Sequence, residues 1–144
     1  LELPKILPDA IKEFGKVKSA VGTFFEDENL EDARRNWLYK PENGGIFLDW
    51  IHPVEVLYKG CGAEFGECYD VETFIIKPEY DPVYPTAISA KFKLSGSNFT
   101  QDASATIRVG KGFPHGILRK TLRLYFENGG FLDLNYVSSE QEFT

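Results

Sequence analysis

From Tyr69 onward, the period of the apolar residues changes to two, and this pattern constrains the fold more than any other feature. In the first alternating segment every second residue is apolar, while Ser89, Lys91 and Lys93 lie between them. The segments that share this pattern are Ile88–Leu94, Ala103–Val109, Leu118–Phe126 and Leu132–Tyr136. Such alternation is typical of antiparallel strands that bury one face and expose the other to water.

Glycine-containing turns separate these four segments and predict an up-and-down strand order. The turn sequences are Ser95-Gly96-Ser97-Asn98, Lys111-Gly112-Phe113-Pro114 and Asn128-Gly129-Gly130, of which the last is typical of a tight β-hairpin. We therefore predict a four-stranded antiparallel meander. A strand at Tyr69–Lys77 precedes it, and the β-branched and aromatic segment Val17–Phe25 is expected to join the same sheet.

The early part of the chain contains helical patterns instead. Apolar residues spaced by three and four predict a short amphipathic helix over Leu7–Phe14, with Pro8 and Asp9 in its first turn and Gly15 at its end. A second apolar run of helical length extends over Ile46–Tyr58. Helices early and strands late predict a single α+β domain over residues 1–144. Its predicted architecture is a predominantly antiparallel open sheet with helices packed on one face.

Composition excludes several classes of protein. The chain has 144 residues, 42% of them hydrophobic, and a formal net charge of −6, which argues against disorder and against general nucleic-acid binding. No uncharged apolar run is long enough to span a membrane.

Cys61 and Cys68 have a spacing that fits no zinc site, so we favour free thiols over a local disulfide. Free thiols and the absence of a signal peptide favour a cytoplasmic protein.

The sequence contains no Met and begins at Leu1, which leaves two interpretations open. The chain is either a mature or trimmed protein or a domain of a longer one, and we favour the second.

The segment around Asp49 and His52 carries the strongest signal for chemistry. In a helix these two residues share a face, because they are three positions apart. A carboxylate beside an imidazole can fix its tautomer and make it a general acid or base, although a structural pair is the alternative. Tyr39 and Lys40 precede the Gly44-Gly45 pair and are candidate substrate-binding residues for a sugar, with simple packing as their alternative.

The order of these features resembles the C-terminal domain of the Gfo/Idh/MocA oxidoreductases, the family of glucose–fructose oxidoreductase and inositol dehydrogenase. The residues that carry the resemblance are Gly44-Gly45, Asp49 and His52, followed by an antiparallel sheet with an Asn-Gly hairpin. Segments 11–17 and 126–132 are also similar to the family's entry into this domain and to its late hairpin. The resemblance implies an α+β fold like the C-terminal domains of glyceraldehyde-3-phosphate dehydrogenase and dihydrodipicolinate reductase.

In function, the resemblance implies the substrate-binding and oligomerisation half of an oxidoreductase that uses NAD or NADP and acts on a sugar or polyol. The family's N-terminal Rossmann domain is absent from this chain. Asp49 and His52 would be catalytic, with His52 exchanging the proton of the substrate hydroxyl; the family spaces them by four residues, and here the spacing is three. The chain has no G-x-G-x-x-G motif, so we expect it to bind no dinucleotide by itself.

A non-catalytic module that binds a carbohydrate or a protein through its antiparallel sheet is the competing hypothesis. Basic residues gather late in the chain and form either a solvated face or a surface for an anion or partner: Arg108, Lys111, His115, Arg119, Lys120 and Arg123. The outward face of the predicted sheet also carries Tyr125 and Phe131. Aromatic residues mixed with arginine are typical of protein interfaces, so we expect a homodimer through the open sheet face.

Overall fold

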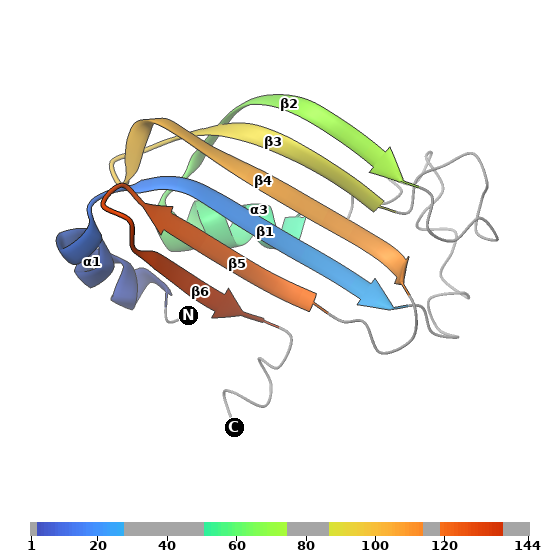
Figure 1. Cartoon of the computed structure of the whole chain (residues 1–144), viewed down its shortest axis with the longest axis horizontal. Coiled ribbons are helices and arrows are strands. Elements are labelled where there is room, and N and C mark those ends of the chain that lie inside the picture. Colours follow the sequence, from blue (N-terminus) through green and yellow to red (C-terminus); the bar gives the residue numbers. More distant parts are fainter. Residues whose placement is uncertain (1–2, 28–50, 75–86, 114–118, 137–144) are drawn as a thin grey trace.

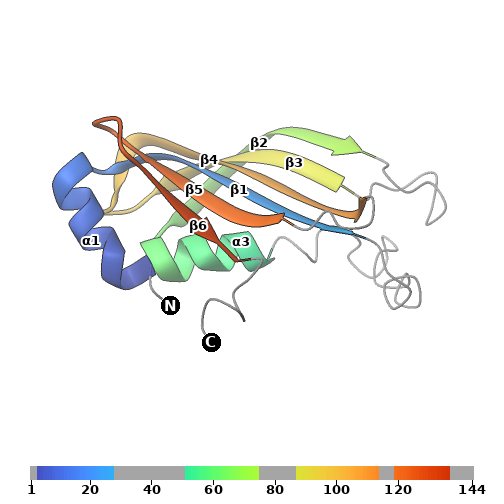
Figure 2. The ribbon, with the colours of Figure 1, turned by 60° about the horizontal axis from the view of Figure 1, so that its bottom comes forward.

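The computed structural model describes residues 3–27, 51–74, 87–113 and 119–136 and has the predicted α+β architecture (Figure 1). Its elements, in chain order, are α1 (Leu3–Phe14), β1 (Val17–Asp27), α3 (Ile51–Glu55), η4 (Val56–Gly60, a π-helix), β2 (Glu64–Phe74), β3 (Ala87–Ser95), β4 (Phe99–Phe113), β5 (Arg119–Phe126) and β6 (Phe131–Asn135). Figure 2 shows two layers, with the helices on one face of a single sheet. The prediction of helices on one face is therefore confirmed.

The strand order differs from the predicted meander. The six strands follow each other as β2-β3-β4-β1-β5-β6, so β1 lies between β4 and β5. It pairs parallel with β4 and antiparallel with β5, while β2–β3, β3–β4 and β5–β6 are antiparallel pairs. The prediction of four consecutive strands in one meander is wrong, although the sheet remains predominantly antiparallel. Alternation identifies strands but carries no information about which strands are neighbours.

β1 is central because it has a paired neighbour on each edge, β4 and β5. Val17, Ala20 and Phe24 are buried under the helices, and Thr23 is buried on the opposite face. The outward residues Val21 and Phe25 are only partly buried, as expected in a sheet that carries helices on one face. The prediction that Val17–Phe25 joins the sheet is confirmed, and its place is the middle of the sheet.

The first helix begins earlier than predicted. It starts at Leu3 instead of Leu7, so Pro8 lies inside the helix and not in its first turn. Pro8 cannot donate a backbone hydrogen bond, and a proline inside a helix is unfavourable by itself. Leu3 and Leu7 are both buried in the core, and their burial favours the additional turn. Gly15 ends the helix as predicted, with a φ of +86° that a residue without Cβ adopts readily.

Two strands also have bounds that differ from the prediction. β2 begins at Glu64 instead of Tyr69, and two register shifts against β3 break the alternation by which a strand would be recognised. β4 continues through Phe113, so a turn at Lys111-Gly112-Phe113 is wrong. Backbone pairing of Asp27 with Phe113 keeps this glycine-containing segment extended. The turns at 95–98 and 128–130 are confirmed, the latter with a hydrogen bond from Phe126 N–H to the Gly130 carbonyl at 2.9 Å.

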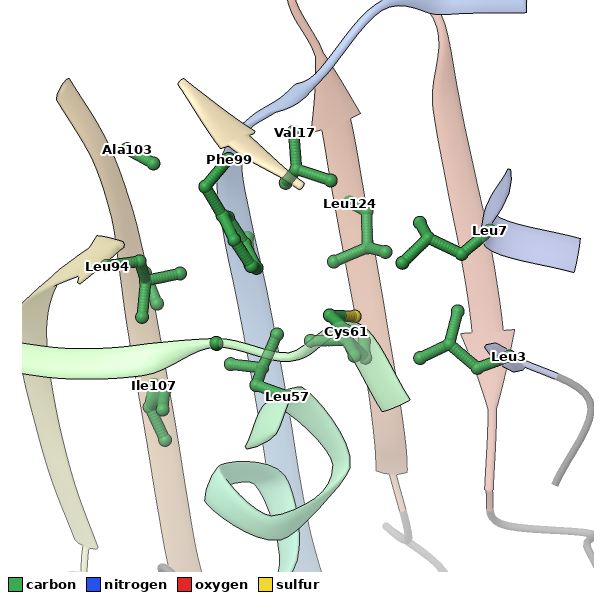
Figure 3. Close-up of a cluster of buried hydrophobic side chains, with 14 of the residues drawn as sticks. Leu3, Leu7, Val17, Leu57, Cys61, Leu94, Phe99, Ala103, Ile107 and Leu124 are labelled. Carbon is green, nitrogen blue, oxygen red and sulfur yellow. The ribbon is translucent and has the colours of Figure 1, made fainter. Parts of the chain in front are cut away.

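The core lies between the helical layer and the inward face of the sheet (Figure 3). The alternation predicts its sheet side correctly, because the inward residues of β4 and β5 are buried: Ala103, Ala105, Ile107, Val109, Leu122, Leu124 and Phe126. Leu57 and Cys61 meet them from the helical side, together with Leu3 and Leu7 of α1. Burial raises the pKa of the Cys61 thiol to about 12, so this side chain stays uncharged and behaves as an apolar residue.

Candidate functional site

A pocket of about 310 Å³ lies on the helix-covered side of the sheet. Its walls come from α3 and η4 on one side and from β1, β5 and the residue after β6 on the other. The lining residues are Phe24, His52, Glu55, Val56, Lys59, Lys120 and Tyr136. Small-molecule sites start at about this volume and combine apolar walls with a few polar groups.

The helical wall of the pocket is one stripe of side chains. His52, Glu55, Val56 and Lys59 are spaced by three, four and seven residues, which places them on the same side of the helical segment. Its opposite side rests on the sheet through Pro53, which is buried. A Cβ at Gly22 of β1 would lie 3.4 Å from the Pro53 Cβ, at the short end of ordinary van der Waals contact, so α3 packs closely over β1 here.

An ion pair forms the outer part of this wall. Glu55 Oε1 and Lys59 Nζ lie 2.5 Å apart, one helical turn from each other. The hydrogen bond and charge of Lys59 hold the pKa of Glu55 below its usual value, with a smaller contribution from His52. The same contact raises the pKa of Lys59. Both side chains are largely exposed, so the ion pair adds little to the stability of the fold. It fixes the positions of the two charged groups at the mouth of the pocket.

The sheet wall is aromatic with one lysine. The ring centroids of Phe24 and Tyr136 lie 6.1 Å apart and the ring planes make an angle of 31°. Tyr136 is held against β5 by a hydrogen bond from its N–H to the Lys120 carbonyl at 2.6 Å, and Lys120 pairs in register with Phe24. Burial, with a smaller effect of Cys61, raises the pKa of the Tyr136 hydroxyl to about 12. A tyrosine hydroxyl is protonated at neutral pH with or without this shift, so the shift reflects burial of the group and adds no new chemistry.

The structure brings one predicted site residue into this pocket. His52 is exposed at the pocket wall, where a ligand can reach its imidazole. Asp49, Tyr39 and Lys40 lie outside the described residues, as does the first part of the predicted helix over 46–58. The remaining part is helical from Ile51 and continues as a π-helix to Gly60, a form that is frequent at functional sites.

Several lining residues were not among the predicted catalytic and substrate-binding residues, although Lys120 was named in the basic cluster, and two signals could have placed them at the site. The spacing from His52 predicts Glu55 and Lys59 on the same helical face. Lys120 falls on the inward set of β5, together with Leu122 and Leu124, and a lysine in an otherwise apolar set is a departure that marks a site. Tyr136 continues the inward set of β6, and nothing in the sequence separates it from a core residue.

The described part of the chain shows no metal site and no membrane-spanning helix. Within residues 3–27, 51–74, 87–113 and 119–136, no group of three or more His, Cys, Asp and Glu side chains is arranged to hold a metal ion. The helices in these ranges are too short or too polar to cross a membrane. Both cysteines are free thiols, Cys61 buried and Cys68 exposed.

The sheet face away from the helices has a different chemistry. Arg123 of β5 binds Asp133 of β6 through two hydrogen bonds of 2.6 Å, and its guanidinium lies 4.3 Å from the ring centroid of Phe131 and 5.8 Å from that of Tyr125. Further along the sheet, β3 lysines pair with β2 carboxylates, Lys91 with Asp70 at 3.8 Å and Lys93 with Glu67 at 3.6 Å. We call this surface the open face.

The predicted basic cluster does not form one surface. Arg123 and Arg119 pair in register with the outward residues Val21 and Phe25 of β1 and lie on the open face. Lys120 lies on the helix-covered side instead, at the pocket. The Lys111 and His115 side chains lie outside the described part of the chain. The sequence run of basic residues is thus divided between the two sides of the sheet.

No protein-family model and no curated protein matches the chain. Solved structures match its fold. The apo scyllo-inositol dehydrogenase from Lactobacillus casei superposes with a TM-score of 0.69 over 91% of this chain and 35% of its own, at 16% sequence identity. Biliverdin reductase from Synechocystis sp. PCC 6803, with biliverdin and NADP+ bound, superposes with a TM-score of 0.61. The match covers 93% of this chain and 40% of the reductase, at 18% sequence identity.

A 3-ketoreductase from Actinomadura kijaniata, in complex with TDP-benzene and NADP, gives a TM-score of 0.63 over 94% of this chain and 37% of its own, at 17% identity. These structures are oxidoreductases of the Gfo/Idh/MocA type. The chain spans about a third to two-fifths of their length. At such identities the likeness shows the fold alone, and that fold is the one described above for this chain.

Proposed function

We propose that this chain is the substrate-binding and oligomerisation domain of an NAD(P)-dependent oxidoreductase that acts on a hydroxyl group of a sugar or polyol. The observation that carries the proposal is the exposed His52 at the wall of a pocket of small-molecule size. The shared fold with a scyllo-inositol dehydrogenase and with two NADP-bound reductases supports it. Each of those proteins is longer than this chain, which leaves room for a second domain.

The nicotinamide cofactor does not fit the residues described here. A dinucleotide needs a glycine-rich turn that leads from a strand into a helix, so that the helix N-terminus faces the pyrophosphate. The glycine-rich segment 60–66 leads from η4 into β2, the opposite order, and Gly60 is packed against Leu3. In this proposal the cofactor therefore belongs to a separate Rossmann domain, and this chain contributes the substrate side.

His52 has the chemistry that alcohol oxidation requires of this domain. A hydroxyl group that becomes a carbonyl must lose a proton, and an imidazole accepts or returns one near neutral pH. Glu55 and Lys59 neutralise each other one turn further along, so their pair adds no net charge beside the imidazole. Asp49 is proposed as its carboxylate partner, and Tyr39 and Lys40 as further substrate contacts.

The test is a His52→Ala substitution in the longer protein that contains this chain. We expect turnover to fall about 10²–10⁴-fold, the usual effect of losing a positioned acid or base, with the melting temperature unchanged. Turnover is measured as NADH or NADPH absorbance with cyclic and acyclic polyols as substrates. Near-normal turnover in this variant would show that His52 is not the acid or base.

A matched control lies on the same helical segment. Tyr58 is 61% exposed and does not line the pocket, so Tyr58→Ala changes the segment without changing the site. We expect its turnover to remain within about twofold of the unsubstituted enzyme. If the longer protein transfers no hydride with any polyol, the competing hypothesis of a non-catalytic binding module is favoured.

The open face is proposed as the homodimer interface. Phe131 is 54% exposed beside Arg123, and aromatic residues and arginine are both enriched in protein interfaces.

We also propose a cytoplasmic location. The two free thiols support it because reducing compartments keep cysteines unpaired.

A further inference from the structure

Thr23 of β1 is the only polar side chain that is buried in the described part of the chain, with 8% of its surface exposed. It lies on the open face, on the other side of the sheet from α1, α3 and η4 (Figure 2). No described residue forms a hydrogen bond with its hydroxyl. Leaving a buried hydroxyl without a partner is unfavourable, and such groups normally bind protein, water or a ligand.

A pocket of about 420 Å³ on the open face includes Thr23 in its lining. Thr121 of β5 pairs in register with Thr23, and Asn135 of β6 pairs with Thr121, so three polar residues form a row across the strands. Arg119 also lines the pocket and lies on the same face of β5, two positions before Thr121. The pocket therefore combines a cation with two hydroxyl groups.

A second arginine lies on the other side of Thr23. Arg108 of β4 is exposed and pairs in register with Thr23. Arg119 is a diagonal neighbour of Thr23, because its own partner on β1 is Phe25. Neighbouring strands are about 4.8 Å apart, and diagonal neighbours about 7–8 Å apart, which long side chains can span. Both arginines are therefore within reach of a group bound at Thr23.

The two arginines also lack a carboxylate partner. Three other cations of the open face pair with carboxylates of neighbouring strands: Lys91, Lys93 and Arg123. Within residues 3–27, 51–74, 87–113 and 119–136, the side chains of Arg108 and Arg119 form no ion pair and no hydrogen bond. Glu72 of β2 lies in the same cross-strand row, but Ser89 of β3 separates it from Arg108. Two unpaired cations in a chain of net charge −6 make this place locally positive.

We infer that the open face binds an oxyanion, a phosphate group or a carboxylate, at Thr23, Arg108, Arg119 and Thr121, which we call the arginine–threonine site. Guanidinium groups bind such anions through paired N–H donors, and the two hydroxyls supply further donors. Two positive charges favour a doubly charged group, such as a phosphate monoester, over a single carboxylate. The inference goes beyond the proposed function and does not rest on it, because His52 lies on the other side of the sheet.

The first experiment adds inorganic phosphate to the chain and follows three groups by NMR: the Thr23 methyl group and the Nε–H groups of Arg108 and Arg119. Sodium chloride at equal ionic strength is the control, because it screens charge without offering an oxyanion. We expect saturable shifts with phosphate and a dissociation constant of roughly 1–10 mM. Chloride should shift the same resonances at least about fivefold less. Equal shifts with the two salts would overturn the inference.

Variants test the composition of the site. Arg108→Gln, Arg119→Gln and the isosteric Thr23→Val should each weaken phosphate binding about 10-fold. Thr23→Ser keeps the hydroxyl and should bind within about threefold of the unsubstituted chain. Lys93→Gln is the matched control: it removes a cation of the same face that Glu67 already pairs, and binding should change less than about twofold. Unchanged binding in Arg119→Gln or in Thr23→Val would overturn the inference. Arg119 is exposed, so its variant decides even if Thr23→Val does not fold.

The homodimer proposed for the open face offers the same chemistry, because a carboxylate side chain of the second copy is also an oxyanion. A dilution series in phosphate-free buffer separates the two sources. A carboxylate of the second copy shifts the Arg119 resonance as the protein concentration rises, and the same three variants then weaken association. A free anion shifts this resonance when phosphate is added to dilute protein. If neither change shifts it, water satisfies the Thr23 hydroxyl and the inference is overturned.

Discussion

The two sides of the sheet use the same strands and different chemistry. On the helix-covered side, buried residues such as Leu122 and Leu124 pack under α1, α3 and η4, and one end of this layer opens into the pocket with His52. On the open face, between those same positions, Arg123 is held by Asp133 and two aromatic rings. One strand thus packs into the core on one side and presents arginine and aromatic side chains on the other, so changes at adjacent positions should have unrelated effects.

The largest expected effect is a loss of stability on the helix-covered side. Leu124 is fully buried, and Leu124→Ala should reduce the free energy of unfolding by about 2–5 kcal/mol because it leaves a cavity. Thr121, three positions earlier, lies on the other side, and Thr121→Ala should cost at most about 1 kcal/mol. Urea unfolding measures both. If the two variants lose similar amounts of unfolding free energy, the two sides of the sheet do not differ in their contribution to stability.

A second change should affect assembly and leave stability unaltered. Tyr125→Asp places a carboxylate within the aromatic and arginine cluster of the open face, and a lost interface aromatic weakens association by about 30-fold or more. Light scattering at tens of micromolar should change from dimer to monomer. Arg123→Glu should give the same result, and Lys5→Glu on the exposed surface of α1 serves as the control. A monomeric unsubstituted chain would contradict the proposed interface.

The smallest expected effect concerns the pH dependence of the open face. The hydrogen bond from Arg123 holds the pKa of Asp133 below its ordinary value of 3.8. A carboxyl group with a lowered folded-state pKa contributes stability above the unfolded-state pKa and loses it as the pH falls through the folded-state pKa. Below about pH 4 the unsubstituted chain should therefore lose a degree or two of melting temperature that Asp133→Asn does not lose. If the melting temperatures of the two proteins fall equally as the pH is lowered, the Arg123–Asp133 ion pair contributes nothing to stability.

The sequence predicts the two sides of the sheet better than it predicts the order of its strands. Alternation depends on local periodicity, so the inward residues of β4 and β5 could be assigned from neighbouring residues alone. The place of β1 depends on pairing with residues far along the chain, and no local pattern records it. The helix start at Leu3 escaped prediction for a related reason, since its burial against Gly60 overrides the unfavourable Pro8.

The candidate site was predicted in the same uneven way. His52 could be identified as a candidate because it follows a glycine pair and an aspartate at helical spacing, a pattern that has a chemical interpretation beside the structural one. Phe24 and Tyr136 could not, because an inward aromatic residue has the same sequence pattern whether it fills a core or lines a pocket. Only the arrangement of α3 and η4 over β1 and β5 makes them part of a site.

The central position of β1 has a consequence for the synthesis of this protein. Within this chain β1 leaves the ribosome well before its neighbours β4 and β5, and the hydrogen bond from Lys16 N–H to Glu127 joins residues 111 positions apart. Until β5 has emerged, β1 has an unpaired edge that any extended chain can join. A strand that ends at the centre of the folded sheet is thus an aggregation-prone edge while the later strands of this domain are being translated. Holding chaperones should therefore matter more for this domain than for one of similar size built from sequential hairpins.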